Sequence, residues 1–185
     1  TLQLYAVLLP YMESGPTEWE RDQMKDLFND GQIAMYVNGP WGEGQHKEKV
    51  PNQLIAPVPH GPSGTNGTIL ITDSLAVFKG TGNEELATKL AKALTSGEAQ
   101  YDLDMTWGLT PILDYEKLGM TDVFYKKGNW PVFVAGISTG GPEPMVEDFK
   151  ALQAVFTNMI QGIMLGEGTV DELVTQAGVE LAAVR

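Results

Sequence analysis

The most constraining feature of this sequence is an apolar stripe with helical period near the carboxyl end. Its members recur every three or four positions: Phe149, Leu152, Phe156, Met159 and Ile163. This spacing places all of them on one face of a helix, and that face must be buried against another element. Gly166 and Gly168 follow the stripe and end the helix, because glycine readily adopts the backbone conformation of a helix terminus.

A second helix follows directly. The run Thr169-Val170-Asp171-Glu172 is a capping box, in which the threonine and glutamate side chains satisfy the free amides of a first helical turn. Leu173, Ala177 and Leu181 then lie on one side of the helix. The sequence therefore predicts a packed pair of helices at this end of the chain.

The amino-terminal part mixes helix and strand signals. A capping box at residues 17–20 predicts a helix that carries Trp19, Leu27 and Phe28 and ends near Asn29. Residues 33–37 predict a strand, which residues 38–40, Asn-Gly-Pro, stop because proline cannot donate to the ladder. The strand and turn deliver Trp41 to an exposed loop.

The middle of the chain continues the mixture. Residues 42–67 are rich in Gly, Pro and Asn and predict irregular chain, and residues 68–78 predict extended chain. Asn83 caps a predicted helix on which Leu86, Leu90 and Leu94 recur every fourth residue. Residues 130–135 are apolar and β-prone. Strands and helices in one chain indicate the α/β class.

Charge and composition exclude several function classes. Twenty-four acidic residues stand against 12 basic ones, for a net charge of -12, so nucleic acid and anionic membrane surfaces are repelled and a neutral ligand suits the field better. The chain has no cysteine and two isolated histidines, His46 and His60, which are expected in loops. A thiolate or zinc site is therefore not expected. Dinucleotide and P-loop glycine motifs are lacking, so we expect no cofactor.

The run from Leu27 to Trp41, LFNDGQIAMYVNGPW, resembles a signature of the bacterial extracellular solute-binding protein family 1, which includes maltodextrin-binding proteins. Further matches follow in the order of that family. They are residues 56–59, 75–77, 83–87, 95–100, 108–111 and 168–173. The resemblance covers nearly the whole chain but only the second half of the family's pattern.

The resemblance implies the carboxyl-terminal half of a periplasmic-binding-protein-like α/β fold with two lobes. Residues 1–72 and 116–185 are expected in the carboxyl-terminal lobe, and residues 73–115 are expected to cross into the amino-terminal lobe. A receptor of this kind closes on a sugar between its lobes and delivers it to the membrane permease subunits of an ABC importer. The amino-terminal half of the receptor is then a missing partner. The implied location is periplasmic or extracellular, and a lipid anchor on the missing part is compatible with it.

Sugar recognition requires aromatic faces for the C–H patches of the ring and polar groups for the hydroxyls. The resemblance makes Trp41 the first candidate, with Asn38 and Gly39 in the same turn, and a core tryptophan is the alternative. Asp73 would either accept two sugar hydroxyl protons or cap a turn at a hinge. Trp107 and Trp130 are further stacking faces or packing residues.

The sequence of one later helix bears on sugar size. Maltodextrin-binding relatives carry a stacking aromatic in the helix before the final one, where this chain has Leu152 or Gln153. This departure favours a different or smaller sugar.

An enzyme and an interaction module are the alternatives to a receptor. Residues 136–140, Gly-Ile-Ser-Thr-Gly, match the nucleophile-elbow pattern, but the required helix and later histidine do not follow. A glycoside hydrolase needs two facing carboxylates, and no local motif selects such a pair. A scaffold that binds proteins through its acidic surface is the third class. We expect a non-catalytic carbohydrate receptor, with a glycoside hydrolase or other carbohydrate-active enzyme domain as the runner-up.

Overall fold

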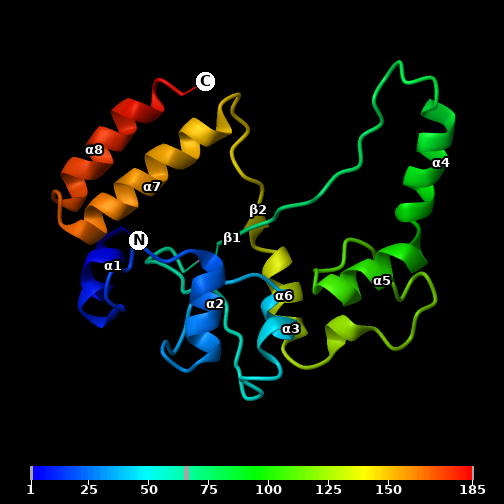
Figure 1. The fold of residues 1–185 in the computed structure, drawn as a ribbon, viewed down its shortest axis with the longest axis horizontal. Helices are drawn as coiled ribbons and strands as arrows, with labels where there is room; N and C mark the ends of the chain where they lie inside the picture. Colours follow the sequence, from blue (N-terminus) through cyan, green and yellow to red (C-terminus); the bar gives the residue numbers. More distant parts are fainter. Residues whose placement is uncertain (1, 65–66, 185) are drawn as a thin grey trace. The chain divides into compact units, whose positions relative to one another are not determined.

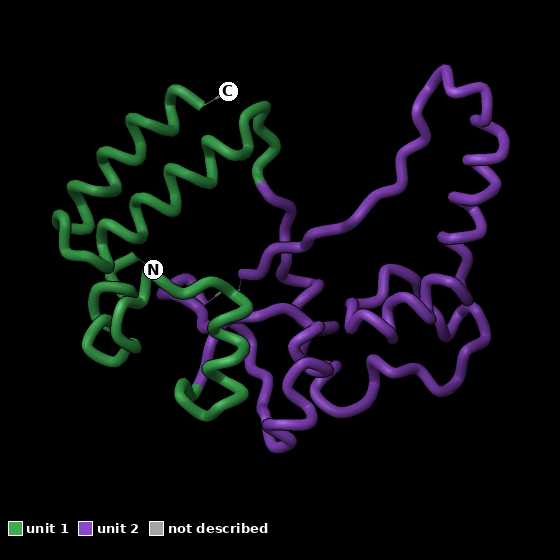
Figure 2. Tube along the Cα trace, in the orientation of Figure 1, with its two compact units in different colours: residues 1–34, 144–185 green, residues 35–143 purple. Residues whose placement is uncertain are grey.

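A computed structural model describes residues 2–64 and 67–184 (Figure 1). The chain forms two compact units, residues 1–34 with 144–185 and residues 35–143 (Figure 2). In the order of the chain, the elements of the first unit are α1 (Leu2–Leu8), η1 (Leu9–Tyr11), α2 (Arg21–Asn29), α7 (Phe149–Leu165) and α8 (Val170–Leu181). Those of the second unit are α3 (Gly42–His46), β1 (Thr68–Ile69), α4 (Glu84–Leu94), α5 (Gly97–Trp107), η2 (Phe124–Lys126), α6 (Trp130–Ile137) and β2 (Gly140–Gly141).

The first unit is organised around α7 and α8, which pack side by side as the sequence predicts (Figure 1). Val155, Met159 and Ile163 of α7 form its core with Ala177 of α8, and α1 packs against the same core. The predicted stripe is confirmed except at Phe156, which is exposed while its neighbour Val155 is buried. The apolar face of a helix is wider than one row of side chains, so the buried surface includes Val155 and leaves Phe156 outside it.

The ends of these helices are also as predicted. The Asp148 carboxylate accepts a hydrogen bond from the Ala151 amide at 2.9 Å at the start of α7, and Gly166 ends the helix with φ of 70°. The capping box before α8 is formed: the Glu172 carboxylate accepts from the Thr169 amide at 2.9 Å, and the Thr169 hydroxyl accepts from the Glu172 amide at 3.3 Å. Hydrogen bonds that the Thr169 amide and hydroxyl donate to the Glu172 carboxylate hold the pKa of Glu172 below its usual range.

The predicted capping box at residues 17–20 is wrong, because α2 begins three residues later than that box requires. Glu20 is the N-cap, and its amide donates to the Gln23 side chain at 2.8 Å. The Trp19 indole instead donates to the Ser14 carbonyl at 3.1 Å and so belongs to the preceding turn. The predicted end near Asn29 is confirmed.

Sheet structure in the second unit is limited to one short parallel pair. Thr68 of β1 lies opposite Gly140 of β2, and Ile69 lies opposite Gly141. The Leu70 amide still donates to the Gly141 carbonyl at 2.9 Å, and extended residues 71–78 continue beyond it without a partner strand among the described residues. The predicted strand at residues 33–37 is likewise extended chain and not part of a sheet, and Met35 and Val37 are exposed. A strand requires a neighbouring strand to accept its hydrogen bonds. A local sequence pattern cannot show whether that neighbour is present.

The β-prone stretch 130–135 is a helix, α6, and the predicted strand is therefore wrong. Pro131 lies in the first turn, where its missing amide proton and fixed φ favour a helix start. A short apolar run does not distinguish a strand from a buried helix by period. The short helix α3 also lies inside the stretch 42–67 that the sequence predicts as irregular.

Helix α4 occupies the predicted residues, but its apolar stripe is exposed. Leu86, Leu90 and Leu94 all lie open to solvent among the described residues. The Asn83 side chain does not cap the helix. Instead the Glu84 carboxylate accepts the Gly80 amide at 2.6 Å, and backbone hydrogen bonds from Glu84 itself and from Gly80 hold its pKa below its usual range. Among the described residues, no helix has both the length and the hydropathy that crossing a bilayer requires.

Burial in the first unit predicts a sharp difference between two truncations. Ile163 is buried in the α7–α8 core, whereas Val179 is exposed on α8. Ile163→Ala should lower the free energy of unfolding by about 2–5 kcal/mol, through lost transfer free energy and a residual cavity. The matched change Val179→Ala should stay within about 0.5 kcal/mol. Chemical denaturation measures both, and equal losses would show that the helix pair is not the core of this unit.

Candidate ligand-binding site

The site is built on the turn that presents Trp41. The amides of Gly42 and Glu43 donate to the carbonyls of Gly39 and Pro40, both at 3.0 Å, and α3 starts immediately afterwards. The Trp41 indole folds back over Gly39, where an added Cβ would lie 2.2 Å from the Trp41 Cη2 atom. Trp41 is consequently part-buried on its own turn and part-exposed.

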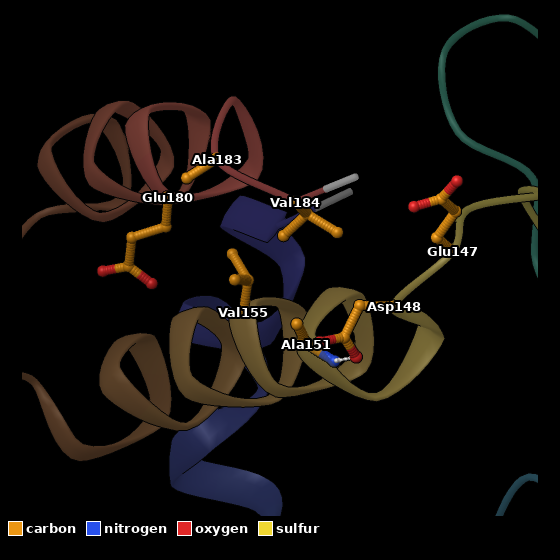
Figure 3. Close-up of a pocket in the computed structure, with 7 residues that line it drawn as sticks. All are labelled: Glu147, Asp148, Ala151, Val155, Glu180, Ala183 and Val184. Carbon is orange, nitrogen blue, oxygen red and sulfur yellow. Dashed lines mark hydrogen bonds between the residues drawn. The ribbon is translucent and has the colours of Figure 1, made fainter.

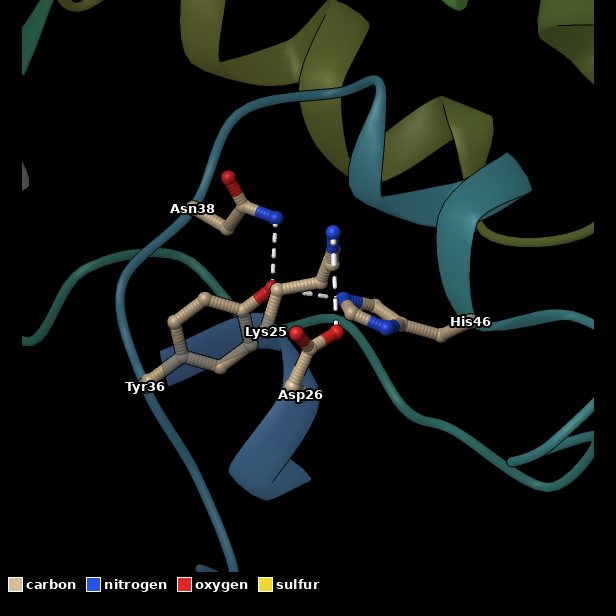
Figure 4. Close-up of polar contacts among 5 residues, drawn as sticks. All are labelled: Lys25, Asp26, Tyr36, Asn38 and His46. Atoms are coloured by element: carbon tan, nitrogen blue, oxygen red, sulfur yellow. Dashed lines mark hydrogen bonds and ion pairs between the residues drawn. The ribbon is translucent and has the colours of Figure 1, made fainter. Parts of the chain in front are cut away.

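A polar network fixes Asn38 at the start of this turn (Figure 4). The Asn38 amide nitrogen donates to the Tyr36 hydroxyl at 2.7 Å, and the same hydroxyl lies 2.6 Å from Nε2 of His46. The Tyr36 hydroxyl therefore bridges the Asn38 amide and the His46 ring. Far from being a loop residue as predicted, His46 ends α3 and is only 3% exposed. The His60 side chain is exposed in irregular chain, as expected.

Helix α3 is tied from its other side to the start of α6. The Asn129 amide nitrogen donates to the Glu43 carboxylate at 3.0 Å and to the Gln53 carbonyl at 3.4 Å. The Gln53 side chain in turn donates to the Glu43 carbonyl at 2.9 Å. Two of the three acceptors are backbone carbonyls and the third is a carboxylate on a helix, so the network leaves α3 little freedom relative to α6.

The end of α5 closes the site. Gly108 terminates the helix in the left-handed conformation, with φ of 68°. An added Cβ there would lie 2.9 Å from Cα of Trp41 and 3.6 Å from the Pro40 carbonyl oxygen. Glycine is therefore required both for its backbone conformation and for this close approach. The neighbouring Trp107 is 66% exposed.

Trp130 lies in an aromatic cluster. Its ring meets Phe124 edge to face at 4.8 Å and lies 5.7 Å from Phe133. Phe124 meets Tyr101 of α5 at 5.6 Å, and Tyr101 meets Tyr115 edge to face at 5.1 Å. Edge-to-face geometry is favourable because the positive ring edge faces a negative ring face. The cluster links α5, η2 and α6.

A buried polar pair lies at the end of this cluster. The Tyr115 hydroxyl donates to the Asp104 carboxylate at 2.5 Å, and the two side chains are 0% and 2% exposed. Burial raises the pKa of the Asp104 carboxyl, and the hydrogen bond from Tyr115 lowers it in part. Burial also raises the pKa of the Tyr115 phenol, and Asp104 adds to that rise. Residues 115–119, which carry Tyr115, form a turn.

The structure gathers some of the predicted site residues and separates others. Asn38, Gly39 and Trp41 share one turn, and Trp107 adjoins it through Gly108. Trp130 follows Asn129, which bonds to α3. Asp73 is exposed in the extended segment between β1 and α4. Sequence reasoning missed the residues that support the turn, which are Tyr36, Glu43, His46, Asp104, Tyr115 and Asn129.

A groove in the first unit has an apolar floor and an acidic rim (Figure 3). Ala151, Val155 and Val184 line it together with Glu147, Asp148, Glu180 and Ala183. Asp148 faces the Ala151 amide as the cap of α7, which accounts for its position. Residues 2–64 and 67–184 contain no group of three or more His, Asp or Glu side chains arranged to hold a metal ion.

The nucleophile-elbow match at residues 136–140 is not realised. Helix α6 precedes Ser138 where the elbow needs a strand, and β2 follows where it needs a helix. The Ser138 hydroxyl donates to the Ala135 carbonyl at 2.9 Å. This serine therefore closes a helix end and does not stand on a strained turn.

Comparisons with known proteins agree on a class of binding protein. A family model described as bacterial extracellular solute-binding protein matches residues 3–127. Binding proteins of Brucella abortus strain 2308 and Brucella suis biovar 1 are each 26% identical over 174 residues, which is 93% of this chain and 42% of the relative. The maltose-maltodextrin binding protein of the thermoacidophilic bacterium Alicyclobacillus acidocaldarius aligns with a TM-score of 0.71 at 19% identity, over 98% of this chain and 50% of that one.

These matches confirm the resemblance predicted from the run Leu27–Trp41. The chain spans 42% of the length of the curated relatives and 50% of the solved structure. It thus has the periplasmic-binding-protein fold over about half the extent of a maltodextrin-binding protein.

The contact between Gly39 and Trp41 predicts the effect of one methyl group. Gly39→Ala should displace the indole, because the new Cβ would overlap the ring, and should shift the Trp41 contribution to the fluorescence emission towards the red. The contribution is obtained as the difference from Trp41→Phe. Gly44→Ala in α3, where nothing lies within 4 Å, is the control and should leave the spectrum unchanged. An unshifted Gly39→Ala spectrum would mean that the ring is not held on its own turn.

The buried Asp104 carboxyl predicts a pH dependence of stability. Its pKa is raised in the folded chain, so the folded state holds the proton more tightly than the unfolded state. The free energy of unfolding should therefore fall as the pH rises from the ordinary value of 3.8 through the raised one, and level off above it. Asp104→Asn should remove this fall. Urea denaturation across that range measures it, with the exposed Asp102→Asn on the same helix as the charge control. Parallel curves for the parent and Asp104→Asn would contradict the assignment.

Proposed function

Because the chain belongs to the bacterial extracellular solute-binding protein family, we propose that it is part of a non-catalytic sugar receptor that delivers its ligand to an ABC importer. The observation that carries this proposal is the Trp41 turn. A part-exposed indole is held there on a backbone that α5 approaches through Gly108 and that continues into α3. A large aromatic face fixed before the ligand arrives costs little entropy on binding.

The composition of the site supports a sugar over a charged ligand. An aromatic face contacts the C–H patches of a pyranose, and Asn38 in the same turn carries an amide that matches hydroxyl groups. The net charge of -12 disfavours anionic solutes. Leu152 or Gln153 stands at the position of a stacking aromatic in maltodextrin-binding relatives, and the lack of an aromatic at either residue supports a small sugar over a long maltodextrin.

The remainder of a longer receptor is part of the proposal. The exposed stripe of Leu86, Leu90 and Leu94 on α4 and the unpaired extended segment before it are surfaces that a protein of this kind covers with further chain. In the assembled receptor we propose that residues 1–72 and 116–185 form one lobe and that residues 73–115 cross into the other. Asp73 would then lie at the crossing. The proposed location is periplasmic or extracellular, and the proposed partners are the permease subunits.

Sugar binding to the full-length receptor tests the proposal. Titration calorimetry with a panel of monosaccharides, disaccharides and maltotriose should identify a sugar that binds. Trp41→Ala should then weaken the binding free energy of that sugar by roughly 1–3 kcal/mol, the range for loss of a large aromatic contact.

Trp19→Phe is the control for tryptophan loss, because Trp19 belongs to the turn before α2 in the other compact unit. It should leave the affinity unchanged. If Trp41→Ala binds the same sugar as tightly as the parent, Trp41 is a packing residue and the proposed site is wrong.

A further inference from the structure

The buried pair of Tyr115 and Asp104 has no contact with the proposed ligand site, yet it is the most completely buried polar pair in the described residues. Its surroundings are aromatic, with Tyr101 at 5.1 Å and Tyr125 at 6.2 Å from the Tyr115 ring. A carboxyl and a phenol in such a place are desolvated at a cost, and their mutual hydrogen bond offsets it only while the geometry holds.

Asp104 connects this pair to the end of α5. Its side chain accepts from Tyr115, while its backbone carbonyl accepts from the amides of Gly108 and, at 2.9 Å, Leu109. One residue thus joins the turn around Tyr115 to the two residues that follow the helix. A movement of Asp104 that breaks its hydrogen bond with Tyr115 also moves the Asp104 carbonyl oxygen, which accepts from the amides of Gly108 and Leu109.

The end of α5 is in turn pressed against the ligand site. Gly108 approaches the backbone of Trp41 so closely that a Cβ there would lie 2.9 Å from Cα of Trp41. A Cβ at 2.9 Å from a backbone carbon would overlap it, so only glycine lets the end of α5 pass the Trp41 backbone this closely, and the path of α5 limits where the Trp41 turn can lie. The contact involves backbone on both sides, which cannot yield by a change of rotamer.

The turn that carries Tyr115 is itself held in place. The Met120 amide donates to the Tyr115 carbonyl at 3.0 Å, and Leu118 packs on Gly97 at the start of α5, with Cδ1 2.6 Å from the position of an added Cβ. Tyr101 fixes the following segment by donating to the Asp122 carbonyl at 3.1 Å. Tyr115 is therefore a fixed point against which Asp104 can be held.

We propose that Tyr115 is a positioning residue for the ligand site: by holding Asp104 it sets the end of α5, and through Gly108 it sets the Trp41 turn. The importance of this for sugar binding rests on the function proposed above. A pair of apolar side chains of the same shape would fill the volume without the cost of desolvation. The hydrogen bond fixes the orientation of α5, because its geometry is satisfied at only one rotation of the helix about its axis.

Amide hydrogen exchange followed by mass spectrometry tests the proposal on the intact protein without any sugar. Tyr115→Phe removes one oxygen and should speed exchange in residues 39–46 roughly 3- to 10-fold, the change expected when a buried hydrogen bond is lost. Exchange in α7, which belongs to the other compact unit, should be unchanged. Asp104→Asn keeps a carbonyl acceptor for the phenol and should stay close to the parent.

Tyr11→Phe is the control for loss of a phenol, because Tyr11 is 84% exposed and belongs to the other compact unit. It should leave residues 39–46 at the parental rate. Faster exchange confined to residues 97–120 would overturn the proposal, and so would a uniform rise across residues 35–143, which would mean a general stabilising role. Since no sugar is used, failure to find a sugar ligand would sink the proposed function and leave this result standing.

Discussion

The arrangement of the candidate site depends on the hydrogen bond from the Tyr115 phenol to the Asp104 carboxylate. Both groups are removed from water, so neither can exchange its partner for a solvent molecule without opening the unit. The bond joins α5 to the turn that follows it, and the end of α5 bears on the backbone of Trp41. The position of Trp41 is thereby set by a buried hydrogen bond between residues that lie outside the proposed ligand site.

Two further contacts make the Trp41 turn rigid from other directions. Tyr36 connects Asn38 to the buried His46, and Asn129 connects Glu43 to the start of α6. The three supports come from separate parts of residues 35–143 and hold the turn from different directions. Rigid support of this kind is what a binding site needs when its affinity comes from one or two aromatic contacts.

The second unit also exposes apolar side chains on α4 and on the extended segment before it. Leu86, Leu90 and Leu94 would form an ordinary buried stripe if another element lay across α4. The extended chain from Leu70 to Phe78 would form an ordinary strand beside a partner. The chain aligns with 50% of the solved structure of the related maltose-maltodextrin binding protein.

What the sequence determined is local. The period of Met159 and Ile163, the capping box at Thr169 and the glycine at Gly166 specify the α7–α8 pair, since each acts within a few residues. The order of motifs around Trp41 also identified the family. Tertiary structure decided the rest. Residues 130–135 became a helix, and residues 33–37 joined no sheet among the described residues, because a strand depends on a neighbour that no local pattern encodes. The supports of Trp41 come from residues as distant as Gly108 and Asn129, and only folding brings their atoms within bonding or contact distance of the turn.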